Sequence, residues 1–110
     1  MPPTRARSAS TVDPNAAALF VYGGRYRTGT SGPYTVFGDL WRHDPAAGTW
    51  TALHDGKGGP TARSHGLLLA RPGVGKAASA ELYLYGGNAS NNGLQMQPLG
   101  DTWRFDLATA

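Results

Sequence analysis

The sequence predicts an all-β fold made of two copies of one repeated unit, and three observations support this prediction. The run Leu19–Gly24 (LFVYGG) returns 63 residues later as Leu82–Gly87 (LYLYGG). Both runs are followed by Gly-Asp-x-Trp-Arg-x-Asp, starting at Gly38 and at Gly100. The chain of 110 residues contains 16 Gly and 8 Pro, and its apolar residues show no sustained helical period. An internal period of this size indicates one supersecondary unit used twice.

The first predicted elements are a leader and a buried strand. Residues 1–17 are predicted as a loose leader, because prolines and the turn signal Asp13-Pro14-Asn15 interrupt them. Within this leader, Arg7-Ser8 is a candidate for the remnant of a degenerate first strand. Leu19–Tyr22 is a continuous apolar run closed by Gly23-Gly24, which is typical of a strand buried on both faces.

The rest of the first unit is predicted as a loop and two strands. Residues 25–37 contain glycines, a proline and several hydroxyls, and this composition predicts a long loop. Asp39–Asp44 alternates as a strand does, with Trp41 and His43 on one face. The turn Asp44–Gly48 then leads into Thr49–Leu53, the last predicted strand of this unit.

The second half of the chain repeats this order. A glycine-rich loop, Asp55–Pro60, leads to an apolar run within Ser64–Ala70, which the glycine- and proline-containing segment 71–75 breaks. Glu81–Tyr85 matches the first buried run. A polar loop follows from Asn88 to Gly100, and Asp101–Leu107 is the last predicted strand.

Four short strands in sequential hairpins, used twice, are typical of β-propeller blades. We therefore expect a partial β-propeller of two adjacent four-stranded antiparallel blades, the first repeat at 18–59 and the second at 60–110. The second repeat stops at Ala110, before the position that would match Trp50, so we expect its last strand to be missing. Propellers close with about four to eight blades. We expect either that the chain is a fragment of a longer protein or that copies of it self-associate into a ring.

The order of these motifs resembles the kelch repeat over nearly the whole chain. In the first copy the diglycine is followed by Tyr34, six residues and Trp41, with Trp50 as the second tryptophan. In the second copy Trp103 follows the diglycine, and Met96 occupies the tyrosine position. Pro60–His65 resembles the Pro-x-x-Arg-x-His opening of a kelch first strand. The resemblance implies a kelch-type propeller that serves as a protein-interaction scaffold.

We expect the repeated glycines and tryptophans to form this scaffold rather than a site. A diglycine allows a tight turn or a close backbone approach that a side chain would forbid. Tryptophan offers a large apolar face suited to packing between blades. The residues assigned to this role are Gly23, Gly24, Trp41, Trp50, Gly86, Gly87 and Trp103.

Two loops carry the candidate partner-binding residues. Their cations, rings and amides suit recognition of a protein or peptide partner. The alternative, that they are ordinary solvated loop residues, remains open. The candidates are Arg25, Tyr26, Arg27 and Tyr34 in one loop and Asn88, Asn91, Asn92 and Gln95 in the other.

Composition argues against several other classes of function. The 10 Lys and Arg residues, for a net charge of +3, are scattered along the chain, so we expect no nucleic-acid partner. No apolar run is long enough to span a membrane, and no apolar signal core follows the N-terminal arginines. We therefore expect no membrane partner. The absence of cysteine is compatible with a cytoplasmic location, which we favour.

We expect no catalytic, cofactor-binding or metal-binding residue in this chain. His43, His54 and His65 are evenly spaced but fall on separate predicted elements, so they are not expected to converge on a metal ion. Kelch propellers similar to galactose oxidase use copper with a cysteine-modified tyrosine, and this chain has no cysteine. The alternative hypothesis is a fragment of such a catalytic or carbohydrate-binding propeller, with its active residues outside this chain.

Overall fold

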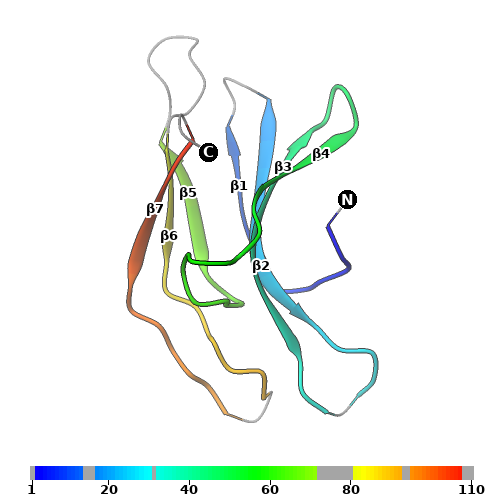
Figure 1. Cartoon of the computed structure of the whole chain (residues 1–110), viewed down its shortest axis with the longest axis vertical. Helices are drawn as coiled ribbons and strands as arrows, with labels where there is room; N and C mark the ends of the chain where they lie inside the picture. Colours follow the sequence, from blue (N-terminus) through cyan, green and yellow to red (C-terminus); the bar gives the residue numbers. More distant parts are fainter. Residues whose placement is uncertain (1, 14–16, 31, 72–80, 93–94, 108–110) are drawn as a thin grey trace.

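The computed structural model describes residues 2–13, 17–30, 32–71, 81–92 and 95–107, which form two antiparallel sheets (Figure 1). Sheet 1 has the order β1-β2-β3-β4, and sheet 2 has the order β5-β6-β7. No helix occurs in the described residues, so the all-β prediction is confirmed for them. The strands are β1 (Ala9–Asp13), β2 (Ala18–Tyr26), β3 (Thr35–Asp44), β4 (Thr49–His54), β5 (Leu67–Arg71), β6 (Glu81–Tyr85) and β7 (Thr102–Asp106).

The β2–β3 hairpin is longer than the sequence predicts. β2 does not end at Gly23-Gly24 but runs through them to Tyr26, and β3 begins at Thr35, so the loop spans only 27–34. Gly23 and Gly24 have φ values of +66° and +106°, and the register shifts between Tyr22 and Gly24. Such a bulge bends a strand while its pairing continues. The diglycine therefore redirects β2 instead of closing it.

Part of the predicted leader is a regular strand. β1 pairs with β2 from Ala9, opposite Tyr22, to Asp13, opposite Ala18. Sheet 1 therefore begins inside residues 1–17, and a boundary at 17/18 would separate β1 from its partner strand. The matching strand of sheet 2 is β5, in which Leu67 lies opposite Tyr85. Most of the predicted break at 71–75 lies outside the described residues.

One apolar core lies between the two sheets, where β1 and β5 are neighbours (Figure 1). Sheet 1 contributes Phe20, Tyr22 and Leu40, and sheet 2 contributes leucines from β5 and β6. The Tyr22 and Phe105 rings join the sheets with their centroids 5.7 Å apart. Burial of one such side chain stabilises a fold by about 1.5–3 kcal/mol, so this core is the main force that holds the sheets together.

The two faces of each sheet differ, and the sheets stack head to tail. We call one face the tyrosine face; in sheet 1 it carries Ala9, Phe20, Tyr22 and Leu40. We call the other the leucine face; in sheet 2 it carries Leu68, Leu82, Leu84 and Phe105. These two faces pack on each other in the core. The remaining faces point outward: the leucine face of sheet 1, with Leu19, Val21, Trp41 and His43, and the tyrosine face of sheet 2, with Leu67, Leu69, Tyr83 and Tyr85.

This stacking decides where the tryptophans lie. Trp103 borders the cleft between the sheets. Trp41 and Trp50 belong to the outward leucine face of sheet 1, where Trp50 packs on His43 with ring centroids 4.5 Å apart. Within the described residues Trp103 borders the space between the two sheets, whereas the face that carries Trp41 and Trp50 is directed away from sheet 2.

Sheet 2 contains a cluster of an arginine, an aspartate and a tryptophan. The Arg63 guanidinium donates to the Gly86 carbonyl oxygen at 3.1 Å and to both carboxylate oxygens of Asp101. Trp103 Nε1 donates to the same carboxylate at 2.6 Å. The Arg63 side chain is fully buried. Its charge is accommodated because a carboxylate and a carbonyl replace the water that it loses.

Sheet 1 repeats this cluster with Arg5, Asp39 and Trp41. Arg5 donates to the Gly23 carbonyl oxygen at 3.0 Å and to both carboxylate oxygens of Asp39, and Trp41 Nε1 donates to Asp39 at 2.8 Å. Arg5 is thus the counterpart of Arg63, and Arg7 is the counterpart of His65, each with φ of 60°. The degenerate motif copy is centred on Arg5 rather than on Arg7-Ser8.

The clusters change the pKa values of their members. Hydrogen bonds from Arg63 and Trp103 hold the pKa of Asp101 well below its usual range. Burial raises the pKa of Asp39, but hydrogen bonds from Arg5 and Trp41 outweigh it, and this pKa is also lowered. Burial raises the pKa of Tyr22 to about 12, and the charge of Arg63 opposes this only in part. The buried Tyr22 hydroxyl has no hydrogen-bond partner among the described residues.

A pair of glycine substitutions tests the contact between the sheets. A Cβ at Gly23 would lie 2.4 Å from the Arg63 carbonyl oxygen of sheet 2, whereas at Gly86 the nearest atom is the Leu99 carbonyl oxygen at 3.4 Å. Both residues have φ near +66°, so either substitution to alanine costs about 1–2 kcal/mol of backbone strain. We expect Gly23→Ala to cost at least twice as much as Gly86→Ala in the free energy of unfolding, measured by urea denaturation. Equal losses would contradict the inter-sheet contact.

A pH series tests the Arg63–Asp101 pair. Because folding lowers the pKa of Asp101, the pair stabilises the fold fully above the unfolded value of about 3.9. This stabilisation is lost as the pH falls through the lowered pKa. When the pH is lowered below about 4, we expect the urea concentration at the unfolding midpoint of the wild type to decrease. Asp101→Asn should have a lower midpoint at pH 7 and a weaker dependence on acid. Asp55→Asn, in an exposed loop, is the control and should follow the wild type.

Candidate functional site

Two arginines and a tyrosine meet at the end of the β2–β3 hairpin. Arg25 lies near the end of β2, Arg27 follows the strand, and Tyr34 directly precedes β3. Tyr26 pairs with Thr35, so the antiparallel register brings these side chains together. The guanidinium carbons of Arg25 and Arg27 lie 4.1 and 4.4 Å from the centroid of the Tyr34 ring. Each such cation–π contact contributes about 0.5–1 kcal/mol at an exposed site.

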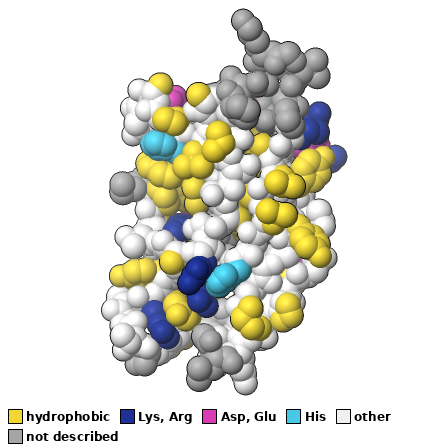
Figure 2. Space-filling model, turned by 180° about the vertical axis from the view of Figure 1, so that it is seen from behind, with side chains coloured by type: hydrophobic (Ala, Val, Ile, Leu, Met, Phe, Trp, Pro, Cys, Tyr) yellow, Lys and Arg dark blue, Asp and Glu magenta, His cyan; other side chains and the backbone are white. Residues whose placement is uncertain are grey.

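Arg7 and His65 complete this region from two other segments. Ala6 and Arg25 exchange main-chain hydrogen bonds of 2.8 Å, which place Arg7 beside the hairpin. The His65 N–H donates to the Arg7 carbonyl oxygen at 2.9 Å. We name Arg7, Arg25, Arg27 and Tyr34 the cationic cluster. In the space-filling view, basic side chains gather beside a histidine on this side of the molecule (Figure 2).

The electrostatics of the cationic cluster favour an anionic ligand. Partial desolvation lowers the pKa of His65, and the positive charges of Arg25 and Arg7 lower it further, so the neutral imidazole is favoured. Among the described residues, no carboxylate forms an ion pair with Arg7, Arg25 or Arg27. A cavity of about 260 Å³ is lined by Ala6, Tyr26 and the cationic cluster. Two guanidinium groups over the Tyr34 ring, with a third from Arg7 in the lining of the same cavity, can therefore bind carboxylate or phosphate oxygens.

The second predicted loop is joined to this site through Asn91. Its carbonyl oxygen accepts a hydrogen bond of 2.8 Å from the Tyr34 N–H. Asn92 and Gln95 are exposed near this junction, and the Gln95 N–H donates to the Asn92 carbonyl oxygen at 3.3 Å. The structure therefore brings the two predicted loops together at one edge of the molecule.

Asn88 does not belong to the exposed part of the site. Its side chain is buried, and its amide oxygen accepts hydrogen bonds from the main-chain N–H groups of Ser90 at 3.1 Å and Gln97 at 2.8 Å. Asn88 therefore holds the loop in shape and is not available to contact a partner. The expectation that it is a contact residue is corrected by this burial.

Arg7 and His65 are not among the residues that the sequence predicts for the site. The sequence places Arg7 in the leader and His65 in a first strand, far from the hairpin loop. The signal that points to them is the repeat itself. Arg7 follows Arg5 by two residues, and His65 follows Arg63 by two residues. Both Arg7 and His65 have a backbone φ of 60°. Because Arg5 and Arg63 are fixed by their clusters, these two positions are directed to the same edge of their sheets.

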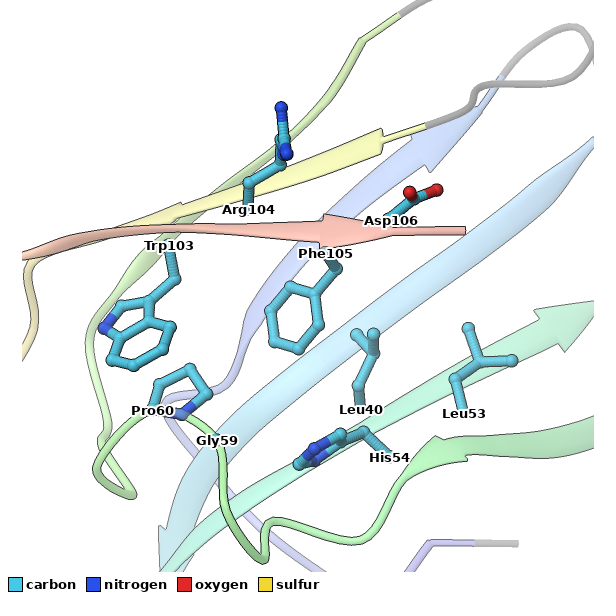
Figure 3. Close-up of a pocket in the computed structure, with 9 residues that line it drawn as sticks. All are labelled: Leu40, Leu53, His54, Gly59, Pro60, Trp103, Arg104, Phe105 and Asp106. Carbon is cyan, nitrogen blue, oxygen red and sulfur yellow. The ribbon is translucent and has the colours of Figure 1, made fainter. Parts of the chain in front are cut away.

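A second cavity lies between the sheets (Figure 3). This cleft of about 290 Å³ is bordered by β4, by the segment 59–60 and by β7. Trp103 and Phe105 point into it, whereas Arg104 and Asp106 point away from it. His54 is held by the Gly56 N–H, which donates to its Nδ1 at 2.9 Å. The lining residues contain a single carboxylate and no acid pair, so the cleft suits an apolar side chain rather than acid–base chemistry.

The three evenly spaced histidines lie in three different surroundings. His43 packs on Trp50, His54 contacts Phe105 in the cleft, and His65 lies beside the cationic cluster. Across the described ranges, no three metal-ligating side chains form a group that could hold an ion. Within the same ranges, the structure contains no helix of the length and apolarity that a membrane span requires.

Comparison with known proteins supports the fold. No protein-family model matches the chain, and no curated protein matches it. A similar solved structure is the one described as "Structure of YjhT", with a TM-score of 0.54 and 22% sequence identity over 79% of this chain. The chain spans 22% of the length of that protein. At this identity the likeness concerns the arrangement of the strands alone.

A titration of His65 tests the electrostatics of the cationic cluster. We expect its pKa to lie below the ordinary value of about 6.5. Replacing either neighbouring cation, in Arg25→Ala or Arg7→Ala, should raise this pKa, because a positive charge that disfavours the imidazolium is removed. The measurement is an NMR titration of the imidazole protons. Lys57→Ala, which removes a cation elsewhere, should leave the titration unchanged, and an equal shift in this control would contradict the assignment.

Proposed function

We propose that the chain is part of a kelch-type β-propeller that serves as a protein-interaction module and binds an acidic segment of a partner protein. The internal repeat, the two head-to-tail sheets and the structural likeness to YjhT support the propeller part of this proposal. Two antiparallel sheets joined in sequence are what adjacent blades of such a scaffold require.

The observation that carries the proposed binding function is the set of arginines around Tyr34. Clustered arginines in proteins normally form ion pairs with carboxylates. In this chain Arg5 pairs with Asp39, and Arg63 pairs with Asp101. Arg7, Arg25 and Arg27 have no such carboxylate among the described residues. A partner carboxylate would supply the missing acceptor through paired, charge-assisted hydrogen bonds.

The position of the site also suits recognition of a peptide. The cationic cluster lies at a hairpin end carried by a rigid sheet, the usual location of binding residues on repeat scaffolds. Arginine and tyrosine are enriched among the residues that contribute most to protein interfaces. The contact between Tyr34 and Asn91 holds the two loops together, so less conformational entropy is lost on binding.

A binding assay with a defined acidic probe tests this proposal. The probe is a fluorescein-labelled peptide of alternating Glu and Gly, and its binding to the 110-residue chain is measured by fluorescence anisotropy. We expect Arg25→Ala/Arg27→Ala to weaken binding at least about tenfold, the effect of losing about 1.4 kcal/mol. Tyr34→Phe keeps the ring between the arginines and should bind as the wild type does, whereas Tyr34→Ala should bind more weakly.

Two controls separate recognition from general attraction to charge. Lys57→Ala removes one positive charge outside the cluster and should leave the affinity unchanged. A peptide in which every Glu is replaced by Gln should not bind. The proposal is refuted if the Gln peptide binds equally well, or if the double arginine variant retains the wild-type affinity.

A further inference from the structure

Each sheet has a tyrosine face and a leucine face, and among the described residues one of each is packed internally. The tyrosine face of sheet 1 packs on the leucine face of sheet 2. This leaves the leucine face of sheet 1 and the tyrosine face of sheet 2 directed outward. The two outward faces are therefore counterparts of the two faces that already form one interface.

The outward tyrosine face of sheet 2 has an exposed apolar part and a charged part. The apolar part carries Leu67, Leu69, Tyr83 and Tyr85, and the charged part carries Arg71, Glu81, Arg104 and Asp106. Leu67, Leu69 and Tyr85 are 53%, 54% and 54% exposed, whereas Ala9 and Tyr22, the counterparts of Leu67 and Tyr85 in sheet 1, are 4% and 1% exposed. Hydrophobic side chains are gathered over both sheets in Figure 2. An exposed apolar patch of this kind marks an interaction surface.

The outward leucine face of sheet 1 has a matching character. Its residues Leu19 and Val21 are only half-buried, although their counterparts Leu82 and Leu84 are 0% exposed. Val12, on the same face of β1, is 58% exposed. The cover that sheet 1 provides for Leu82 and Leu84 is thus missing from Leu19 and Val21 within the described chain.

The main chain carries a second, independent sign of an unfilled contact. Between the sheets, the Gly24 N–H donates to the Arg63 carbonyl oxygen at 2.9 Å, and the Arg63 N–H donates to the Phe37 carbonyl oxygen at 3.1 Å. These bonds need Gly23, because a Cβ there would lie 2.4 Å from the Arg63 oxygen.

Gly86 and Arg5 are the counterparts of Gly23 and Arg63, the two residues of this main-chain contact. Gly86 has the same positive φ as Gly23, yet among the described residues only the Leu99 carbonyl oxygen lies near its absent Cβ. No described residue lies beside Gly86 in the way that Arg63 lies beside Gly23. Arg5, the counterpart of Arg63, is held in sheet 1 by Asp39 and the Gly23 carbonyl oxygen. The Arg5 of one molecule would fit beside the Gly86 of another.

We propose that a second copy of this chain docks head to tail, with the leucine face of its sheet 1 on the tyrosine face of sheet 2. This contact between two molecules has the same geometry as the internal interface, in which the tyrosine face of sheet 1 packs on the leucine face of sheet 2. Tyr85 of one copy then lies on His43 of the next, as Tyr22 lies on Phe105. The contact is heterologous, so further copies add in the same direction until the rotation closes a ring. It does not depend on the cationic cluster and stands whether or not that cluster binds a peptide.

Two charge variants on opposite faces test this docking. Val12→Glu places a charge on the outward leucine face, and Leu69→Glu places one on the outward tyrosine face. Both side chains are more than half exposed, so each variant should fold, which circular dichroism checks. In sedimentation velocity the wild type should form species larger than a monomer that grow with concentration. Each variant alone should remain a monomer, because one half of every contact is blocked.

A mixture of the two variants gives the decisive result. Val12→Glu keeps an intact tyrosine face and Leu69→Glu keeps an intact leucine face, so the mixture should form a one-to-one dimer and nothing larger. Ala47→Glu, in the β3–β4 turn, is the matched control and should associate as the wild type does. A monomeric wild type, a mixture that stays monomeric, or single variants that associate as the wild type does would each overturn the proposal.

A cross-linking experiment covers the case in which a charge variant fails to fold. The chain contains no cysteine, so introduced thiols are unambiguous. His43→Cys mixed with Tyr85→Cys should yield a dimer with a short bis-maleimide reagent. Ala47→Cys mixed with Tyr85→Cys should not. Equal cross-linking of the two mixtures would also overturn the proposal.

Discussion

The structure depends on Arg63, the fully buried arginine at the junction of the two sheets. Its guanidinium is held within sheet 2 by Asp101 and the Gly86 carbonyl oxygen, and its main-chain carbonyl accepts a hydrogen bond from Gly24 of sheet 1. One residue thus stabilises its own sheet and sets the distance to the neighbouring sheet. The Arg63 side chain is fully buried, so loss of Asp101 would leave its charge without a paired carboxylate. The apolar core provides most of the attraction, and Arg63 determines how the sheets are aligned.

The same constraint places the candidate site. Because Arg63 and Arg5 are fixed by their ion pairs, the residues two positions later, His65 and Arg7, are directed to one edge of the molecule. The bulge at the diglycine carries β2 on to Arg25 and into the hairpin that ends beside them. The scaffold clusters and the cationic cluster therefore use arginine in opposite ways. In the scaffold its charge is paired within the chain, and at the edge it is available to a ligand.

The sequence predicts the strands more reliably than it predicts their limits or their neighbours. The repeated apolar runs and the alternation around Trp41 identify β2, β3, β6 and β7, because alternation is a local property of the chain. A degenerate first strand is expected in the leader at Arg7-Ser8, but the bounds of β1 are not predicted, because Ala9–Asp13 contains few large apolar residues and is defined by its pairing with β2. The diglycine is interpreted as the end of a strand, which is correct for Gly86-Gly87 after β6 and wrong for Gly23-Gly24, whose role as a bulge depends on the backbone of Arg63 from the neighbouring sheet. Asn88 is selected for its exposed-loop composition, although it is buried by the loop that it organises.

The sequence by itself determined the all-β class, the repeat and the residue types that recur in each unit. These are local patterns, because side chains of a strand alternate between its two faces and a repeat is visible as a fixed spacing in the sequence. Only the tertiary structure decided that Arg5 is the counterpart of Arg63, which face of each sheet is covered, and which loops meet at Tyr34. The reason is physical: strand register and head-to-tail stacking arise from contacts between residues far apart in the chain. The outward tyrosine and leucine faces are visible only after that stacking is known.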